Sequence, residues 1–351
     1  MPTPLPATLH TVYAELLERC TIEEMVETFP PGGSFYKRLL KGREYWYYKP
    51  STHDDPKRRS KYVGPDTPEL QAMIARHAEA KAERKERRSM VVALVSAGLP
   101  GPDAITGKVL SALAAAGVFR LRGVVVGSVA YQTYAGLLGQ ILSARNAATS
   151  DLDVAQFLSI SMHVEDAIEV PFEEVLKSVD PGFRAIGTLK GNSTTRYALG
   201  RGKYRVEVLT PNEGPDSDAP VHLPALQSDG QPLRFLDFLI HDEVRAVALH
   251  GDGILVNVPA PERFAIHKLL LSRLRLETAE SQAKAEKDLR QAVELMDILI
   301  EQRPYELRDL WQEAWDRGPK WQQYLDEALD LTERRSALPP VKERLLALIA
   351  K

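Results

Sequence analysis

Residues 124–128 read Val-Val-Val-Gly-Ser, and this stretch decides how the rest of the chain is interpreted. The segment 118–126 is β-rich and mostly apolar, which favours a buried strand. Helical spacing begins in the segment 131–142, so Gly127 and Ser128 stand where a strand turns into a helix. Free backbone N–H groups at such a helix start attract phosphate oxygens. An ordinary strand-to-helix turn has the same pattern, so the motif alone leaves both interpretations open.

Two acidic residues, Asp151 and Asp153, begin the next strand candidate, which runs to about residue 160. Residues i and i+2 of a strand point to the same side, so both carboxylates face one spot while Leu152 turns into the core. Two close carboxylates repel each other unless a cation lies between them. Mg²⁺ suits this position because it takes oxygen ligands and bridges carboxylates to substrate phosphates. The alternative is an exposed strand start with two solvated aspartates.

A third acid, Glu207, lies in the apolar strand candidate 204–209 with a valine on each side. The segment 194–199 is expected to pair with this strand through the turn at 200–203. A carboxylate on so apolar a strand needs a partner or a metal ion. The alternative is a glutamate that faces outward from an alternating strand.

The order of these motifs resembles the DNA polymerase β-like nucleotidyltransferase superfamily. The resemblance implies an α+β fold whose core is a mixed sheet with helices, and a reaction that uses two Mg²⁺ ions, or Mn²⁺ in their place. It implies that Asp151 and Asp153 bind both metals and that Glu207 binds the one that activates the attacking hydroxyl. Gly127 and Ser128 would grip the triphosphate of an NTP. The chain departs from the pattern in a longer 128–151 spacing and in having Glu rather than the commoner Asp as the third acid.

The C-terminal half adds to the resemblance. A Pro-led helix carries Lys268, and the next helix carries the pair Lys287-Asp288. This order is similar to that of the abortive-infection nucleotidyltransferases, which are toxins, and it implies a partner antitoxin. By resemblance to that branch, Lys268 would neutralise the charge of the triphosphate, and Asp288 would orient the triphosphate. A lysine that snorkels to solvent and a solvated helix acid are the alternatives. His267 is expected to be a packed helix residue, and Arg273 and Arg275 are expected to be surface charges.

The N-terminal segment is rich in aromatic and basic residues. Between residues 37 and 61 there are nine Lys or Arg and three acids, around a run of four aromatic residues. We expect a β-hairpin here, between a helix at 8–28 and a long charged helix at 67–97 whose middle is a solvated face. Aromatic faces beside cations suit bases and phosphates. The predicted nucleic-acid contacts are Lys57, Arg58, Arg59 and Tyr47. The alternative is that the aromatic residues only pack against neighbouring helices.

These motifs divide the chain into three predicted regions: an N-terminal helical and hairpin module (1–115), a nucleotidyltransferase core (116–258) and a C-terminal helical domain (259–351). The 26% of charged and 44% of hydrophobic residues are typical of a soluble globular protein. A net charge of −3 argues against a protein that coats DNA. The single cysteine, Cys20, excludes an internal disulfide and suits a cytoplasmic setting. No apolar run is long enough to span a membrane.

The sequence therefore predicts transfer of a nucleoside monophosphate from an NTP to a hydroxyl, with release of pyrophosphate. The basic hairpin favours an RNA 3′ end, such as that of tRNA, as acceptor, and a protein side chain or a small molecule stays open. A catalytically silent nucleotide- or nucleic-acid-binding module on the same fold is the alternative function. Retention of all three acids favours the enzyme. The NTP used and the oligomeric state are not indicated by any motif.

Overall fold

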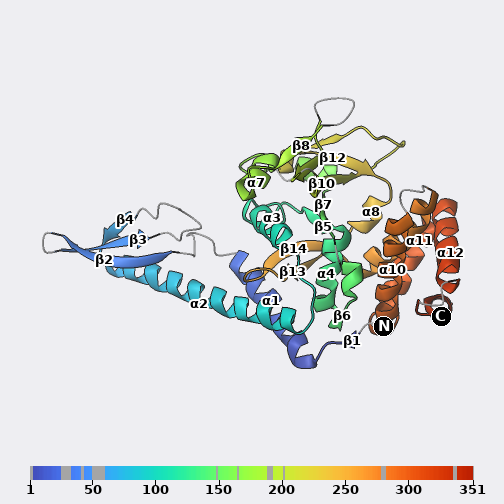
Figure 1. Cartoon of the computed structure of the whole chain (residues 1–351), viewed down its shortest axis with the longest axis horizontal. Helices are drawn as coiled ribbons and strands as arrows, with labels where there is room; N and C mark the ends of the chain where they lie inside the picture. Colours follow the sequence, from blue (N-terminus) through green and yellow to red (C-terminus); the bar gives the residue numbers. More distant parts are fainter. Residues whose placement is uncertain are drawn as a thin grey trace.

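The structure is a computed structural model. It describes residues 3–24, 33–40, 43–49, 60–147, 149–163, 166–187, 193–200, 202–277, 282–334 and 338–350. Helices and a mixed sheet alternate along these ranges, as the predicted α+β class requires. Figure 1 shows the mixed sheet in the middle, a helical layer on one side and an N-terminal arm on the other.

A seven-stranded mixed sheet is the centre of the described molecule. Its strands are β5 (Val124–Val126), β7 (Asp151–Ala155), β8 (Arg184–Ile186), β9 (Arg196–Leu199), β10 (Tyr204–Pro211), β11 (Val221–Leu223) and β12 (Ser228–Leu233). β10 runs parallel to β7 and β12 and antiparallel to β9, and β5 runs antiparallel to β7. The predicted pairing of 194–199 with 204–209 is thus confirmed.

The helix α4 (Gly127–Leu137) begins directly after β5, which confirms that Gly-Ser opens a helix. Two predicted strands are shorter than expected. Residues 118–122 form turns instead of the first half of a strand, because the Asn257 side chain donates to the carbonyls of Phe119 (2.7 Å) and Gly123 (3.0 Å). β7 ends at residue 155, and α6 (Leu158–His163) follows where the sequence predicted strand to residue 160.

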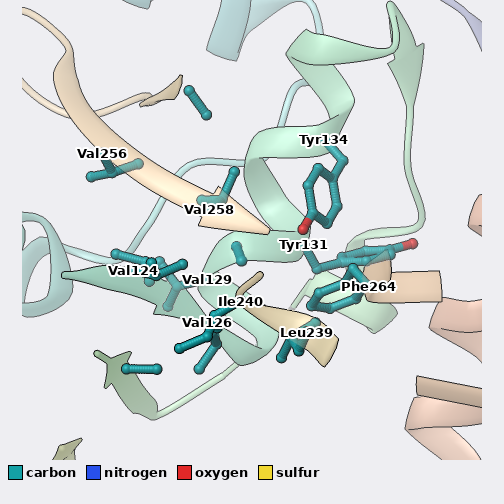
Figure 2. Close-up of a cluster of buried hydrophobic side chains, with 14 of the residues drawn as sticks. Val124, Val126, Val129, Tyr131, Tyr134, Leu239, Ile240, Val256, Val258 and Phe264 are labelled. Carbon is teal, nitrogen blue, oxygen red and sulfur yellow. The ribbon is translucent and has the colours of Figure 1, made fainter. Parts of the chain in front are cut away.

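A hydrophobic cluster holds β5 and α4 in place (Figure 2). The hairpin of β13 (Glu243–Ala248) and β14 (Ile254–Pro259) packs against β5, so valines of β14 meet valines of β5. The Tyr134 hydroxyl donates to the Pro259 carbonyl at 2.8 Å, and its ring stands edge-on to Phe264 at 5.1 Å. Burial of these apolar side chains is worth about 1.5–3 kcal/mol each. The turn at residue 127 is therefore fixed by packing from both sides.

The N-terminal elements are β1 (Thr3–Pro4), α1 (Ala7–Glu24), β2 (Ser34–Leu40), β3 (Arg43–Lys49), β4 (Lys61–Pro65), α2 (Pro68–Ser96) and α3 (Ala104–Ala115), and β1 pairs with β6 (Gln140–Ile141). α1 packs on the core, where the Val247 N–H donates to the Tyr13 hydroxyl at 3.1 Å. The charged middle of α2 is less uniformly solvated than predicted. Arg87 is 1% exposed because its guanidinium reaches Asp252, 3.0 Å away, in the β13–β14 turn.

The hairpin predicted in this region is confirmed as β3 and β4, and β2 adds a third strand that the sequence analysis missed. Figure 1 places this small sheet at the far end of α2 from the mixed sheet. Three of the predicted nucleic-acid contacts, Lys57, Arg58 and Arg59, lie outside the described residues. Tyr47 lies on β3 and is half-buried.

The C-terminal helices follow the predicted order: α9 (Pro261–Leu274), α10 (Gln282–Gln302), α11 (Pro304–Asp316), α12 (Pro319–Glu333) and α13 (Val341–Ile349). A proline at the start of α9, α11 and α12 suits a first turn, where its missing N–H costs no hydrogen bond. Short elements complete the described chain: α5 (Ala144–Ala147), α7 (Phe172–Val179), α8 (Leu236–Leu239) and the 3₁₀ turns Pro224–Leu226 and Arg275–Glu277. The domain boundaries at 115 and 258 stay predictions. Of the helices in the described ranges, none is long and apolar enough to cross a membrane.

Candidate active site

The register of the mixed sheet brings the acids of two strands to one face. Glu207 on β10 lies directly opposite Asp153 on β7, and Asp151 lies opposite Arg205. Directly paired residues on neighbouring strands share a face, and so do residues i and i+2 of one strand. Asp151, Asp153 and Glu207 therefore project from the same side of the sheet. All three are half-buried, so the acidic face stays accessible to solvent.

The start of α4 lies against this acidic face. Gly127 has a φ of +67°, and a Cβ added there would lie 2.6 Å from Asp153 Oδ2. Glycine is required on both counts, since other residues are strained at positive φ and a methyl group would clash. Val126, which precedes the helix, provides no side-chain cap. Backbone N–H groups at this helix start are thus available to an anion next to the acids.

Asp153 has the most strongly perturbed carboxyl of the three acids. Burial raises its pKa to about 6, and the negative charge of Glu207 adds to the increase. The Lys268 ammonium acts in the opposite direction. A carboxylate in this setting gains from any cation that offsets its neighbours, because like charges at close range disfavour ionisation.

The donor set fits a divalent cation with oxygen ligands. Three carboxylates share one face, and the charges of Glu207 and Asp151 add to the effect of burial in raising the pKa of Asp153. In the described part of the chain, however, no three acidic, histidine or cysteine side chains are already gathered as metal ligands. Glu207 Oε1 forms an ion pair with Arg196 Nε of β9 at 2.7 Å. Glu207 is thus shared with a guanidinium, and its metal-ligand role stays a prediction.

A buried ion pair joins α9 and α10 beside the acids. The Lys268 ammonium contacts one oxygen of Asp288 at 2.5 Å, and the Arg275 guanidinium contacts the other. Lys268 is 7% and Asp288 2% exposed, so a snorkelling lysine and a solvated acid are both wrong as interpretations. Arg275, predicted to be a surface charge, is 34% exposed and pairs with this buried carboxylate. Their predicted roles toward a triphosphate stay predictions.

His267 was expected to be a packed helix residue, and the structure agrees, whereas Arg273 was expected to be a surface charge. His267 is buried, as predicted, and burial together with the nearby Lys268 and Arg275 lowers its pKa to about 3. It is therefore neutral near pH 7. Arg273 forms an ion pair with Glu327 of α12.

A polar network that no sequence motif predicted connects α10 to the Gly-Ser turn. Gln291 is fully buried, and its Nε2 donates to the Asn146 carbonyl at 2.7 Å and to Ser128 Oγ at 3.4 Å. Glu294 Oε2 accepts from Asn146 Nδ2 at 2.6 Å and from the Tyr131 hydroxyl. The network fixes α4 and the segment that leads into β7 against α10. Helical spacing from Lys287 through Gln291 to Glu294 was the available signal, since these positions share one face.

Two basic residues near the acids were also missed. Arg205 lies opposite Asp151 in the register, and Arg196 lies opposite Glu207. Lys287, one residue before Asp288, is half-buried by its surroundings, and burial together with Lys268 lowers its pKa. The acidic face is thus bordered by cations, an arrangement that suits a ligand with several negative charges.

Comparison with known proteins gives the family of the chain. A family model described as Nucleotidyltransferase matches residues 104–316, which is more than half of the chain. The chain therefore belongs to this nucleotidyltransferase family. A solved structure, described as an antigenic nucleotidyltransferase-like protein from Paracoccidioides brasiliensis, is 15% identical over 64% of this chain and 94% of its own, with a TM-score of 0.32. No curated protein matches the chain.

Proposed function

We propose that this nucleotidyltransferase transfers a nucleoside monophosphate from an NTP to a hydroxyl group, with Mg²⁺ or Mn²⁺ as cofactor. The register that sets Glu207 opposite Asp153, beside the glycine that opens α4, supports this most directly. A divalent cation at the acids would be bound by carboxylate oxygens, which it prefers as ligands. Phosphates at the helix start would meet free backbone N–H groups.

Different residues of this chain would bind the metal ion and the phosphates. Asp151, Asp153 and Glu207 would hold the ion, which when bound neutralises triphosphate charge and lowers the pKa of the attacking hydroxyl. The N–H groups that follow Gly127 bind phosphate oxygens, and Lys268 lies close enough to Asp153 to influence its pKa. Catalysis here consists of positioning and charge neutralisation.

The chemical step conserves atoms and charge in a simple way. The acceptor oxygen forms a bond to the α-phosphorus of the NTP, and the bond from that phosphorus to the β-bridging oxygen breaks. The hydroxyl proton passes to solvent or to a carboxylate, and pyrophosphate leaves. The acceptor proposed is an RNA 3′ end such as that of tRNA. The resemblance to the abortive-infection branch supports this choice and also a partner antitoxin.

The test is incubation of the protein with each α-labelled NTP, Mg²⁺ and total cellular RNA. We expect one NTP to label RNA, and chelation with EDTA or the substitution Asp151→Asn to abolish labelling. Asp151→Asn keeps the size of the side chain, and circular dichroism checks that it leaves the fold intact. A wild-type protein that binds an NTP without transferring any label would overturn the proposal and favour a silent binding module.

A further inference from the structure

The two faces of the N-terminal sheet have different chemistry. Alternate residues of a strand point to opposite faces. The β2–β3 register pairs Tyr36 with Tyr47, Arg38 with Tyr45 and Ser34 with Lys49. The intervening pairs, Phe35 with Tyr48, Lys37 with Trp46 and Leu39 with Glu44, lie on the other face. We name the first set the tyrosine face and the second set the tryptophan face.

The tryptophan face satisfies its own polar groups. The Lys37 ammonium forms ion pairs of 2.7 Å with both Glu44 and Asp66. Trp46 Nε1 donates to the Asp66 carboxylate at 2.6 Å. Tyr48 is 6% exposed and its ring lies 5.1 Å from that of Phe35. The residues of this face therefore have a structural explanation, and its positive charge is neutralised.

The tyrosine face presents stacked rings and positive charge instead. The Tyr36 and Tyr47 rings stack with centroids 5.9 Å apart and planes 28° apart, and the Arg38 guanidinium lies 5.6 Å from the Tyr47 centroid. The three tyrosines are half-buried, and Arg38 and Lys49 are exposed. Among the side chains described on this face there is no carboxylate. Stacking platforms with cations beside them are the two features that single-stranded nucleic acids need.

The position of the sheet favours a long ligand. Figure 1 shows it at the end of α2 that is remote from the mixed sheet. α2 has 29 residues, so it spans about 44 Å at 1.5 Å per residue. A polynucleotide is able to contact a distant sheet and a catalytic face together, whereas a small acceptor contacts only one. The phenol hydroxyls at the ring edges are able to exchange hydrogen bonds with the ribose 2′-hydroxyl, which distinguishes RNA from DNA.

We propose that the tyrosine face binds single-stranded RNA, which it presents as the acceptor strand. The choice of an acceptor role rests on the proposed nucleotidyl transfer, while the binding itself depends only on the residues of the face. Bases would stack on Tyr36 and Tyr47, and Arg38 and Lys49 would contact backbone phosphates. The tryptophan face, with its internal ion pairs, takes no part.

The experiment measures fluorescence anisotropy of a labelled oligouridylate with the full-length protein, without NTP and without divalent ions. The double substitution Tyr36→Ala/Tyr47→Ala should weaken binding at least about tenfold, since stacking contributes about 1–3 kcal/mol per base and about 1.4 kcal/mol is tenfold. Arg38→Ala should weaken binding and flatten its salt dependence. Lys37→Ala removes the same charge from the opposite face and is the matched control, expected to bind like wild type.

Two further arms keep the outcome decisive. Tyr36→Phe/Tyr47→Phe keeps the rings, so it should retain stacking even if the alanine variant folds poorly, and it should lose the preference for RNA over DNA of the same sequence. Equal RNA binding by the wild type, the alanine variant and Lys37→Ala overturns the proposal. Capture of a protein acceptor with no RNA binding also overturns it. RNA binding without nucleotidyl transfer would instead overturn the proposed function alone.

Discussion

Asp153→Asn is expected to stabilise the protein in the absence of divalent ions while it removes the proposed activity. The structure gives the reason, since burial and Glu207 raise the pKa of the Asp153 carboxyl from 3.8 to about 6. A raised carboxyl pKa means that the folded state disfavours the charged form. Asparagine has nearly the same shape and carries no charge, so the variant avoids this cost.

The sign and size of the effect follow from the two pKa values. Well below pH 3.8, the carboxyl is protonated in both the folded and the unfolded state and costs little. As the pH rises from 3.8 to about 6, the unfolded state loses the proton before the folded state does, so the protein loses stability, and the loss is complete above about pH 6. The difference between the two pKa values corresponds to at most about 3 kcal/mol. The variant should therefore be more stable than wild type at pH 8, by a margin that shrinks toward pH 4.

Urea denaturation followed by tryptophan fluorescence, in EDTA between pH 4.5 and pH 8, measures this margin. Asp288→Asn is the matched control, because Asp288 is buried but already paired with Lys268 and Arg275. Removing one partner of a buried ion pair costs about 3–5 kcal/mol, so the same substitution there should destabilise the protein. Added Mg²⁺ should stabilise wild type at pH 8 and leave Asp153→Asn unchanged.

The reasoning is refuted if Asp153→Asn is no more stable than wild type at pH 8 in EDTA. It is refuted equally if Mg²⁺ stabilises both proteins to the same extent. The first result would mean that the acidic face carries no electrostatic cost, and the second that Mg²⁺ binds without Asp153.

Three other substitutions probe the same site. Gly127→Ala puts a methyl group 2.6 Å from a carboxylate oxygen at a φ of +67°, which should cut transfer at least tenfold, measured by initial rates. Arg196→Ala releases Glu207 from its 2.7 Å ion pair, so the Mg²⁺ concentration for half-maximal activity should fall several-fold; a rise would show that the pair orients the acid. Gln291→Leu removes the hydrogen bonds to Ser128 Oγ and to the Asn146 carbonyl and should raise KM for the NTP more than it lowers kcat. Gln302→Leu, at the C-terminal end of α10, loses a hydrogen bond to the Leu138 carbonyl and should leave KM unchanged.

Local sequence patterns were sufficient to predict several of the helices and strands. The strand-glycine-helix change at residue 127, the Asp-x-Asp strand and the helices from residue 261 onward follow from periodicity and from glycine or proline stops. The strand prediction over residues 118–122 was wrong because tertiary contacts, chiefly those of the Asn257 side chain, hold this apolar run in a turn. β12 was missed because Ser-Asp-Gly-Gln-Pro-Leu has poor strand propensity and is a strand only where β10 offers its edge.

The sequence by itself determined that three acids occur on two strand-forming segments and that a glycine opens the helix between them. It could not determine strand register, and a slip of one residue between β7 and β10 would have turned Glu207 to the opposite face. Register, and the burial of the Lys268–Asp288 pair, depend on packing between segments far apart in the chain. Side-chain periodicity fixes which residues of one strand share a face, whereas only tertiary packing fixes which strands and helices that face meets.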